Sequence, residues 1–200
     1  KPSLKLHILS DLHFEYDTEF QVPETTSDVL ILAGDISPGL NGMARFARST
    51  KPVIYVPGNH EFYGESIHAL PAALRLLANG SSIHLLDNDE VRLGDVRFLG
   101  ATLWTSYELY GIERIGEVTA HADRHLNDYI CIQSENAATL TPGQTVSLHR
   151  KAVDWLERKL DEPFDGKTVV VTHHAPHPAS LMPKHEGKLI NAAYASDLTH

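Results

Sequence analysis

The stretch Val53-Ile54-Tyr55-Val56-Pro57-Gly58-Asn59-His60-Glu61 is the most specific string in the chain, because an apolar run passes directly into a polar turn. The run from Val53 to Val56 is rich in β-branched residues and predicts a buried strand. Pro57-Gly58-Asn59 is favourable turn chemistry by itself, but that does not explain why His60 and Glu61 follow. The amide oxygen of Asn59 suits a hard cation without adding charge, and His60 would then lie beside a metal without binding it.

Three other apolar runs end in the same way. Residues 4–9 lead into Asp11 and His13, residues 29–33 lead into Gly34 and Asp35, and residues 168–172 lead into His173. An extended chain would place the side chains of Asp11 and His13 on one side. A carboxylate such as that of Asp35 can bridge two cations, which an imidazole cannot do.

Each of these residues also has an ordinary structural explanation. The Asp-x-His pair could be a solvated strand end, Asp35 could cap a short helix beginning near Met43, and His173 could be an isolated buried histidine. Four strand ends that all carry metal ligands are harder to attribute to chance. Active sites gather at the carboxyl edge of open sheets, so we expect these side chains to meet at one edge of one sheet.

The rest of the chain predicts a mixed α/β fold. Apolar residues at three- and four-residue steps predict helices over residues 67–78 and 147–160, and Thr141-Pro142-Gly143 reads as a turn before the second helix. Residues 90–93 and 96–99 alternate around Gly94-Asp95 and predict a β-hairpin. Together these elements indicate sheet packed on sheet with helices outside, in a single domain over residues 1–200.

Composition excludes several classes of protein. The longest apolar runs are strand-sized and far shorter than the roughly 20 residues of a membrane helix, so we expect no membrane partner. A net charge of -9 makes nucleic acid a less favoured partner than a small phosphate ester. The chain begins at Lys1 without an apolar signal-peptide core, and its single cysteine, Cys131, can form no internal disulfide. We therefore expect a trimmed cytoplasmic protein.

The ordered motifs resemble the calcineurin-like metallophosphoesterase superfamily, whose signature is Asp-x-His, Gly-Asp, Gly-Asn-His-Asp/Glu, His and Gly-His-x-His. Residues 127–129, 172–176 and 194–198 further resemble a bacterial branch of predicted phosphohydrolases. The resemblance implies a four-layer α-β-β-α sandwich of the metallo-dependent phosphatase type. Its implied metal ligands are Asp11 and His13 for a first metal, Asn59 and His173 for a second, and Asp35 as the bridge, with His60 as the catalytic histidine.

The implied reaction is hydrolysis of a phosphomonoester or phosphodiester by a metal-bridging hydroxide. A metal can lower the pKa of bound water from about 15.7 to about 7, and His60 would stabilise the transition state or protonate the leaving oxygen. Mixed oxygen and nitrogen ligands fit Mn, Fe, Zn or Ni. Substrate preference would come from the loops over residues 104–130 and 174–192.

The final Gly-His-x-His block is missing, because the chain ends Asp197-Leu198-Thr199-His200. We interpret this as truncation, since a decayed site would seldom keep five ligands; a noncatalytic metal- or phosphate-binding scaffold is the alternative. Two further histidine pairs stay open. His121 and His125 are spaced to share a helix face, and His174 and His177 could contact substrate or solvent.

Overall fold

Seven strands form two sheets in the computed structural model, which describes residues 3–199. The first sheet is parallel, in the order β1 (Leu6–Leu9), β2 (Val29–Ala33), β3 (Val53–Val56) and β4 (Ile83–Leu85). The second contains β5 (Asp89–Leu93), β6 (Val96–Ala101) and β7 (Lys167–Thr172), with β5 antiparallel and β7 parallel to β6. The predicted hairpin is therefore the β5–β6 pair.

Strand alternation builds the layers. In β2, Ile31 packs into a core between the two sheets, where it meets Phe98 of β6 and Val171 of β7. Its neighbour Leu32 points to the other face and packs in a second core with Leu74. Successive side chains of a strand point to opposite faces, so one short apolar strand contributes to both cores.

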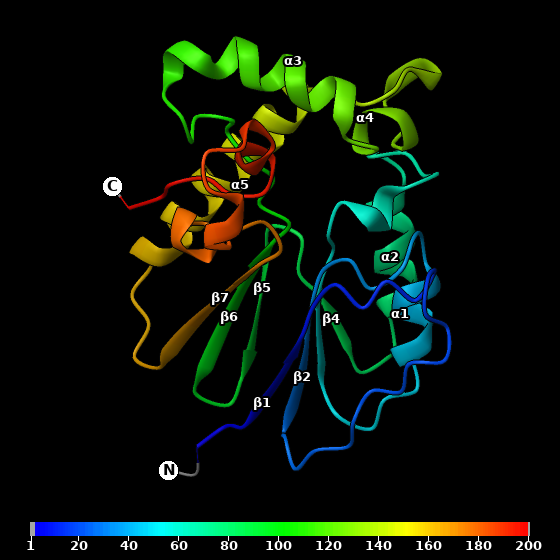
Figure 1. Cartoon of the computed structure of the whole chain (residues 1–200). Coiled ribbons are helices and arrows are strands. Elements are labelled where there is room, and N and C mark those ends of the chain that lie inside the picture. The colour runs from blue at the N-terminus through cyan, green and yellow to red at the C-terminus, as the bar shows by residue number, and fades with distance from the viewer. Residues whose placement is uncertain (1–2, 200) are drawn as a thin grey trace.

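Helices cover the two outer faces. The helices α1 (Asn41–Phe46) and α2 (Leu70–Ala78) lie over the first sheet, and α5 (Pro142–Asp161) packs Ala152 and Leu156 against Leu99 of the second sheet. The helices α3 (Ile115–His125) and α4 (Asp128–Cys131) lie at the end of the sandwich drawn uppermost in Figure 1. The order helix, sheet, sheet, helix confirms the predicted four-layer sandwich. Short 3₁₀ turns are η1 (His60–Phe62), η2 (Ile112–Arg114), η3 (Glu135–Ala137), η4 (Pro178–Ser180), η5 (Pro183–His185) and η6 (Leu189–Ala193).

Both predicted helix starts were wrong by several residues. Ile67 does not belong to α2, because its backbone N–H donates to the Gln133 carbonyl at 2.9 Å and ties this segment to another loop. Conversely, α5 begins at Pro142, where the missing N–H of proline costs nothing. Thr141 caps that helix, and the Gln144 side chain accepts from the Thr141 N–H at 3.0 Å. What reads as a turn is a capping box.

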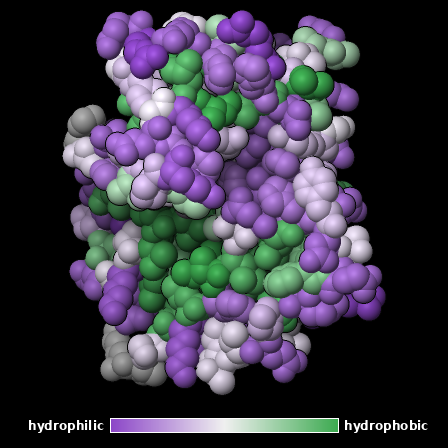
Figure 2. Space-filling view, viewed as in Figure 1, coloured by the Kyte–Doolittle hydropathy of each residue, from purple (hydrophilic) through white to green (hydrophobic). Residues whose placement is uncertain are grey.

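The expectation that four strand ends share one sheet was also wrong. The strands β1, β2 and β3 lie in the first sheet, whereas β7 is an edge strand of the second. The carboxyl end of β7 therefore approaches from across the sandwich. In Figure 2, hydrophobic side chains gather over the strands on the lower part of the visible face, and the upper part is mostly hydrophilic. No helix within residues 3–199 has both the length and the apolar character needed to cross a membrane.

Candidate metal centre

The loops after β1 and β2 turn sharply, which brings their polar side chains together. Asp11, His13 and Asp35 have φ angles of 52°, 45° and 54°, in the left-handed region that residues other than glycine seldom adopt. The Asp11 N–H donates to the Gly34 carbonyl at 3.0 Å, and the His13 N–H donates to the Asp35 carbonyl at 3.1 Å. The expected extended geometry for Asp11 and His13 was thus wrong, because each residue is placed by docking one loop on the next.

Two glycines allow the close approach of the strand ends. A Cβ on Gly34 would collide with the imidazole of His173, and a Cβ on Gly58 would collide with the carboxylate of Asp35. The His173 Nδ1 lies 3.0 Å from the Ala33 carbonyl oxygen. A backbone carbonyl can only accept, so Nδ1 carries the hydrogen and Nε2 is left free to bind a metal.

Two groups of side chains could each hold a cation, and Asp35 belongs to both. One group is Asp11, Asp35 and His173; the other is His13, Asp35 and His60. In each group the ligand atoms lie within 4.8 Å of one another. The two oxygens of Asp35 face different partners: Oδ1 is 3.3 Å from His173 Nε2, and Oδ2 is 3.8 Å from His13 Nε2.

The side chain of Asn59 joins the first group. Its Oδ1 lies 3.1 Å from His173 Nε2, so the two atoms are close enough to bind the same cation. The structure thus brings together all five predicted ligands, but it pairs Asp11 with His173 and pairs His13 with His60. The predicted pairing of Asp11 with His13 on one ion is not the grouping seen among the described residues.

His60 lies directly beside this cluster. Its backbone N–H donates to Asp35 Oδ1 at 2.9 Å, its ring stacks on Tyr63 at 4.1 Å, and it contacts the His13 ring edge-on at 4.5 Å. A ring nitrogen of His60 is within reach of the same ion as His13 and Asp35. The geometry permits both a catalytic role and a ligand role, which the metal content of a His60 variant would distinguish.

Glu61 is a fully buried carboxylate that accepts hydrogen bonds from the backbone of the loops after β2 and β3. Its Oε2 accepts from the backbone N–H groups of Asp35 and Gly58 at 2.9 and 2.7 Å. Its Oε1 accepts from the Ile36 N–H and the Tyr55 hydroxyl, each at 2.8 Å. Burial raises the pKa of Glu61, as does the nearby Asp35 carboxylate, and the hydrogen bonds oppose this shift. The sequence string contains Glu61, but nothing in it predicted this structural role.

Asp128, the first residue of α4, supports Asn59. Its Oδ1 accepts from Asn59 Nδ2 at 2.9 Å and from the Tyr63 hydroxyl at 2.7 Å. With its amide nitrogen held in this way, Asn59 presents its oxygen to His173. Burial raises the pKa of Asp128, although the hydrogen bonds from Tyr63 and Asn59 lower it.

Glu15 lies on the other side of the cluster, where its Oε1 is 3.0 Å from His13 Nδ1 and 3.3 Å from His60 Nδ1. Within residues 3–199, the ion pairs of Glu15 and Asp35 are all with histidines. No lysine or arginine is paired with these two carboxylates in that range. A phosphate bound here would therefore need cations to offset its charge.

Four histidines considered in the sequence, His121, His125, His174 and His177, lie outside the cluster. His174 is buried, stacks on Trp104 at 5.4 Å and contacts the Thr102 carbonyl at 3.1 Å, and burial lowers its pKa to about 3. The expectation that His174 contacts substrate or solvent was therefore wrong, because its side chain is buried. His177 is exposed and accepts from the Ala179 N–H at 3.0 Å. His121 and His125 do share a face of α3, with ring centroids 4.3 Å apart.

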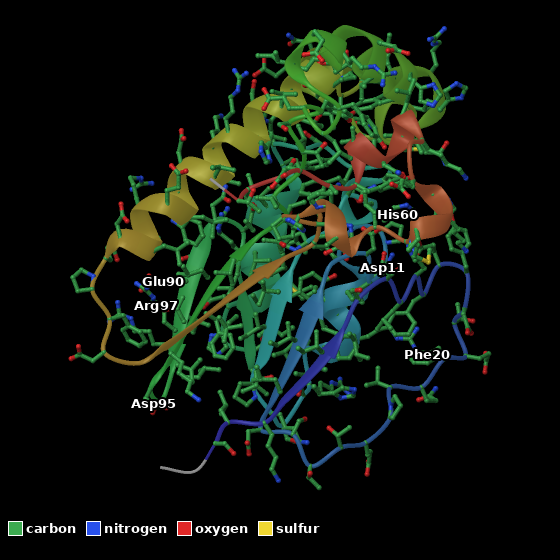
Figure 3. The ribbon with its side chains drawn as sticks, turned by 60° about the vertical axis from the view of Figure 1, so that its left-hand side comes forward. Asp11, Phe20, His60, Glu90, Asp95 and Arg97 are labelled. Carbon is green, nitrogen blue, oxygen red and sulfur yellow. The ribbon has the colours of Figure 1, made fainter. Side chains whose placement is uncertain are left out.

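Figure 3 shows the position of the cluster in the fold. Asp11 and His60 lie close together at the carboxyl ends of the first-sheet strands, beside the segment that follows β7. Glu90 and Arg97 lie far from them, on the opposite side of this view, and Asp95 lies at the lower end of the second sheet. Lys1, Pro2 and His200 fall outside the described residues. The expectations about the start of the chain and about the final Gly-His-x-His block therefore lie partly outside them.

Two groups of candidate ligands that have Asp35 in common, at one end of an α-β-β-α sandwich, fit the class of metal-dependent phosphoesterases. A family model described as calcineurin-like phosphoesterase matches residues 4–198, and the chain belongs to this family. Family and fold together indicate a hydrolase that acts on phosphate esters and uses divalent metals.

The chain is similar to two known proteins, one by sequence and one by structure. Uncharacterized protein L509 of Acanthamoeba polyphaga mimivirus is 27% identical over 198 residues, which cover 86% of this chain and 68% of the viral protein. The crystal structure of phosphopantetheinyl hydrolase (PptH) from Mycobacterium tuberculosis superposes with a TM-score of 0.68 at 21% identity. That match covers 96% of this chain and 76% of the mycobacterial one, and it shows a common fold.

Proposed function

We propose that this protein hydrolyses a small phosphomonoester or phosphodiester with a pair of metal ions held around Asp35. The observation that carries the proposal is that the two oxygens of Asp35 face two separate groups of ligands. The residues proposed to hold the ions are Asp11, His13, Asp35, Asn59 and His173.

The residues present fit such ions chemically. Carboxylate and amide oxygens together with imidazole nitrogens suit Mn, Fe, Zn or Ni, and availability would decide among them. The Ala33 carbonyl holds the hydrogen of His173 on Nδ1, so Nε2 can bind a cation. Hydrogen-bond partners that orient a ligand histidine in this way are typical of metal sites.

When bound, two cations would acidify a water molecule and offset the negative charge of the phosphoryl group. The protein's own part is positioning and proton transfer. Asp35 and the glycine turns fix the ligands, and Asp128 fixes the amide of Asn59. His60 would supply a proton to the leaving oxygen or stabilise the charge that develops there, a contribution typically worth 10²–10⁴-fold in rate.

The proposal is tested with an aryl phosphate and an aryl phosphodiester in the presence of Mn²⁺, together with elemental analysis of the purified protein. A phosphopantetheinyl ester belongs in the substrate panel, because the mycobacterial structure of the same fold is titled a phosphopantetheinyl hydrolase. Asp35→Asn is expected to abolish turnover and deplete metal, whereas His60→Ala lowers turnover and keeps metal. Asp161→Asn, an exposed change at the end of α5, is the matched control.

Two outcomes would contradict the proposal. Equal metal loss in the Asp35 and His60 variants would make His60 a ligand rather than a catalytic residue. Retention of metal by the unmodified protein without turnover of any ester in the panel would favour the noncatalytic scaffold.

A further inference from the structure

Glu15 touches two of the histidines in the cluster through one oxygen atom. Its Oε1 lies 3.0 Å from His13 Nδ1 and 3.3 Å from His60 Nδ1, and its side chain is only 19% exposed. Its other oxygen, Oε2, is buried and has no hydrogen-bond partner within residues 3–199. Within residues 3–199, the ion-pair partners of this carboxylate are the two imidazole rings.

The contacts fix which nitrogen of each ring carries a hydrogen. An ionised carboxylate can only accept, so a ring nitrogen that bonds to it must be the N–H. Both His13 and His60 therefore present Nδ1–H to Glu15 and keep Nε2 for the site. In His13, Nε2 is the nitrogen that faces Asp35 Oδ2, at 3.8 Å.

Neighbouring contacts fix the positions of Glu15 and His60 relative to each other. The neighbour of Glu15, Phe14, is buried, and its N–H donates to the Ile36 carbonyl at 3.0 Å. On the other side, the His60 ring is stacked on Tyr63 and its backbone is tied to Asp35. The carboxylate and the ring thus come from two loops that are both anchored on the segment Asp35-Ile36.

We propose that Glu15 is a positioning residue that orients His60 for proton transfer to the leaving group and His13 for metal binding. This inference rests on the proposed function. As the bond from phosphorus to the leaving oxygen breaks, its electron pair stays on that oxygen, which takes a proton from His60 Nε2. Water supplies the oxygen that replaces the leaving group, and solvent returns the proton to His60.

The kinetic test compares Glu15→Ala, Glu15→Gln, His60→Ala and the double variant Glu15→Ala/His60→Ala. Loss of a residue that orients a metal ligand or catalytic group typically costs 10–100-fold, and we expect that loss in kcat for Glu15→Ala. The loss should be larger for phenyl than for nitrophenyl esters, because a poor leaving group depends more on protonation. Glu15→Gln, which keeps one acceptor oxygen, should recover part of it.

The double variant separates positioning from general disruption. The comparison is made with saturating Mn²⁺, so that the role of Glu15 toward His13 affects metal affinity and not kcat. If Glu15 acts on kcat through His60, adding Glu15→Ala to His60→Ala should then lower kcat by less than threefold. An additional 10-fold loss, or an equal loss for every leaving group, would overturn the proposal. Glu19→Ala, an exposed change on the same loop, should leave kcat unchanged.

A readout without substrate distinguishes failure of this inference from failure of the proposed function. Nitrogen-15 NMR of metal-free protein at alkaline pH reports which ring nitrogen carries the hydrogen. We expect the Nδ1–H form for His13 and His60 in the unmodified protein and a shift toward the Nε2–H form in Glu15→Ala. Nε2–H rings in the unmodified protein would refute the positioning role, whether or not the protein hydrolyses any ester.

Discussion

Replacing the buried Glu61 tests the framework on which the candidate site is built. Its four hydrogen bonds go to the backbone N–H groups of Asp35, Gly58 and Ile36 and to the Tyr55 hydroxyl, at 2.7 to 2.9 Å. Both Glu61 and Tyr55 are fully buried. Glu61→Ala therefore leaves several donors inside the protein without acceptors.

The expected loss can be worked from these contacts. An unsatisfied buried donor costs about 1–3 kcal/mol, but the Tyr55 hydroxyl can turn away and the variant no longer has to desolvate a carboxylate. Three backbone N–H groups stay unpaired, and with the relief from desolvation subtracted we expect Glu61→Ala to lower the free energy of unfolding by about 3–5 kcal/mol, toward the low end of their summed cost. In Glu61→Gln the amide NH₂ can face Tyr55, whose hydroxyl can accept, so that only the Ile36 N–H is left unpaired. That variant should lose about 1–3 kcal/mol.

Urea unfolding of metal-free protein, followed by circular dichroism, measures these differences. Glu24→Ala is the matched control, because Glu24 is exposed and should change stability by less than about 0.5 kcal/mol. A loss below about 1 kcal/mol for Glu61→Ala, or equal losses for the alanine and glutamine variants, would refute the reasoning from the hydrogen bonds.

Three further predictions concern the support of Asn59, the turn at Gly34 and the buried His149. Asp128→Ala frees the Asn59 amide and should weaken metal binding by about 10–100-fold, measured by isothermal titration with Mn²⁺; unchanged affinity would contradict the supporting role. Gly34→Ala forces a Cβ at φ 92° against the His173 ring and should cost about 1–3 kcal/mol in urea unfolding; no loss would count against the close approach. Burial lowers the pKa of His149, so the unfolded chain, with a pKa of about 6.5, is protonated first and stability is lost as the pH falls below that value. His149→Asn should remove up to about 1.4 kcal/mol per pH unit of this dependence, and unfolding curves that keep the same pH dependence would contradict it.

The sequence predicted β1, β2, β3 and β7 because each is a short apolar run with a sharp end, whereas β4 (Ile83–Leu85) was not predicted. The bounds of β2 and β3 agree with the prediction, and the hairpin around Gly94 was correctly placed. It could not show that β7 pairs with β6, because pairing between distant strands leaves no local pattern. The start of α5 was misplaced because Thr141-Pro142-Gly143 fits both a turn and a helix cap.

The ligands were predictable and their supports were not. Asp35 and His173 follow strand ends, which is a signal that can be read along the chain. Glu15, Glu61 and Asp128 act through burial and through bonds to residues up to 69 positions away, and single-sequence patterns contain neither. In particular, Asp128 follows α3, which buries only Val118 and Ala122 and so has a weak apolar stripe.

The central claim is that Asp35 joins two metal ions. Crystals grown with Mn²⁺ and measured near the manganese absorption edge would locate the ions directly by anomalous scattering. The account predicts two peaks, each in contact with a different oxygen of Asp35, one beside His173 and the other beside His13. A single peak, or peaks that do not touch Asp35, would contradict it.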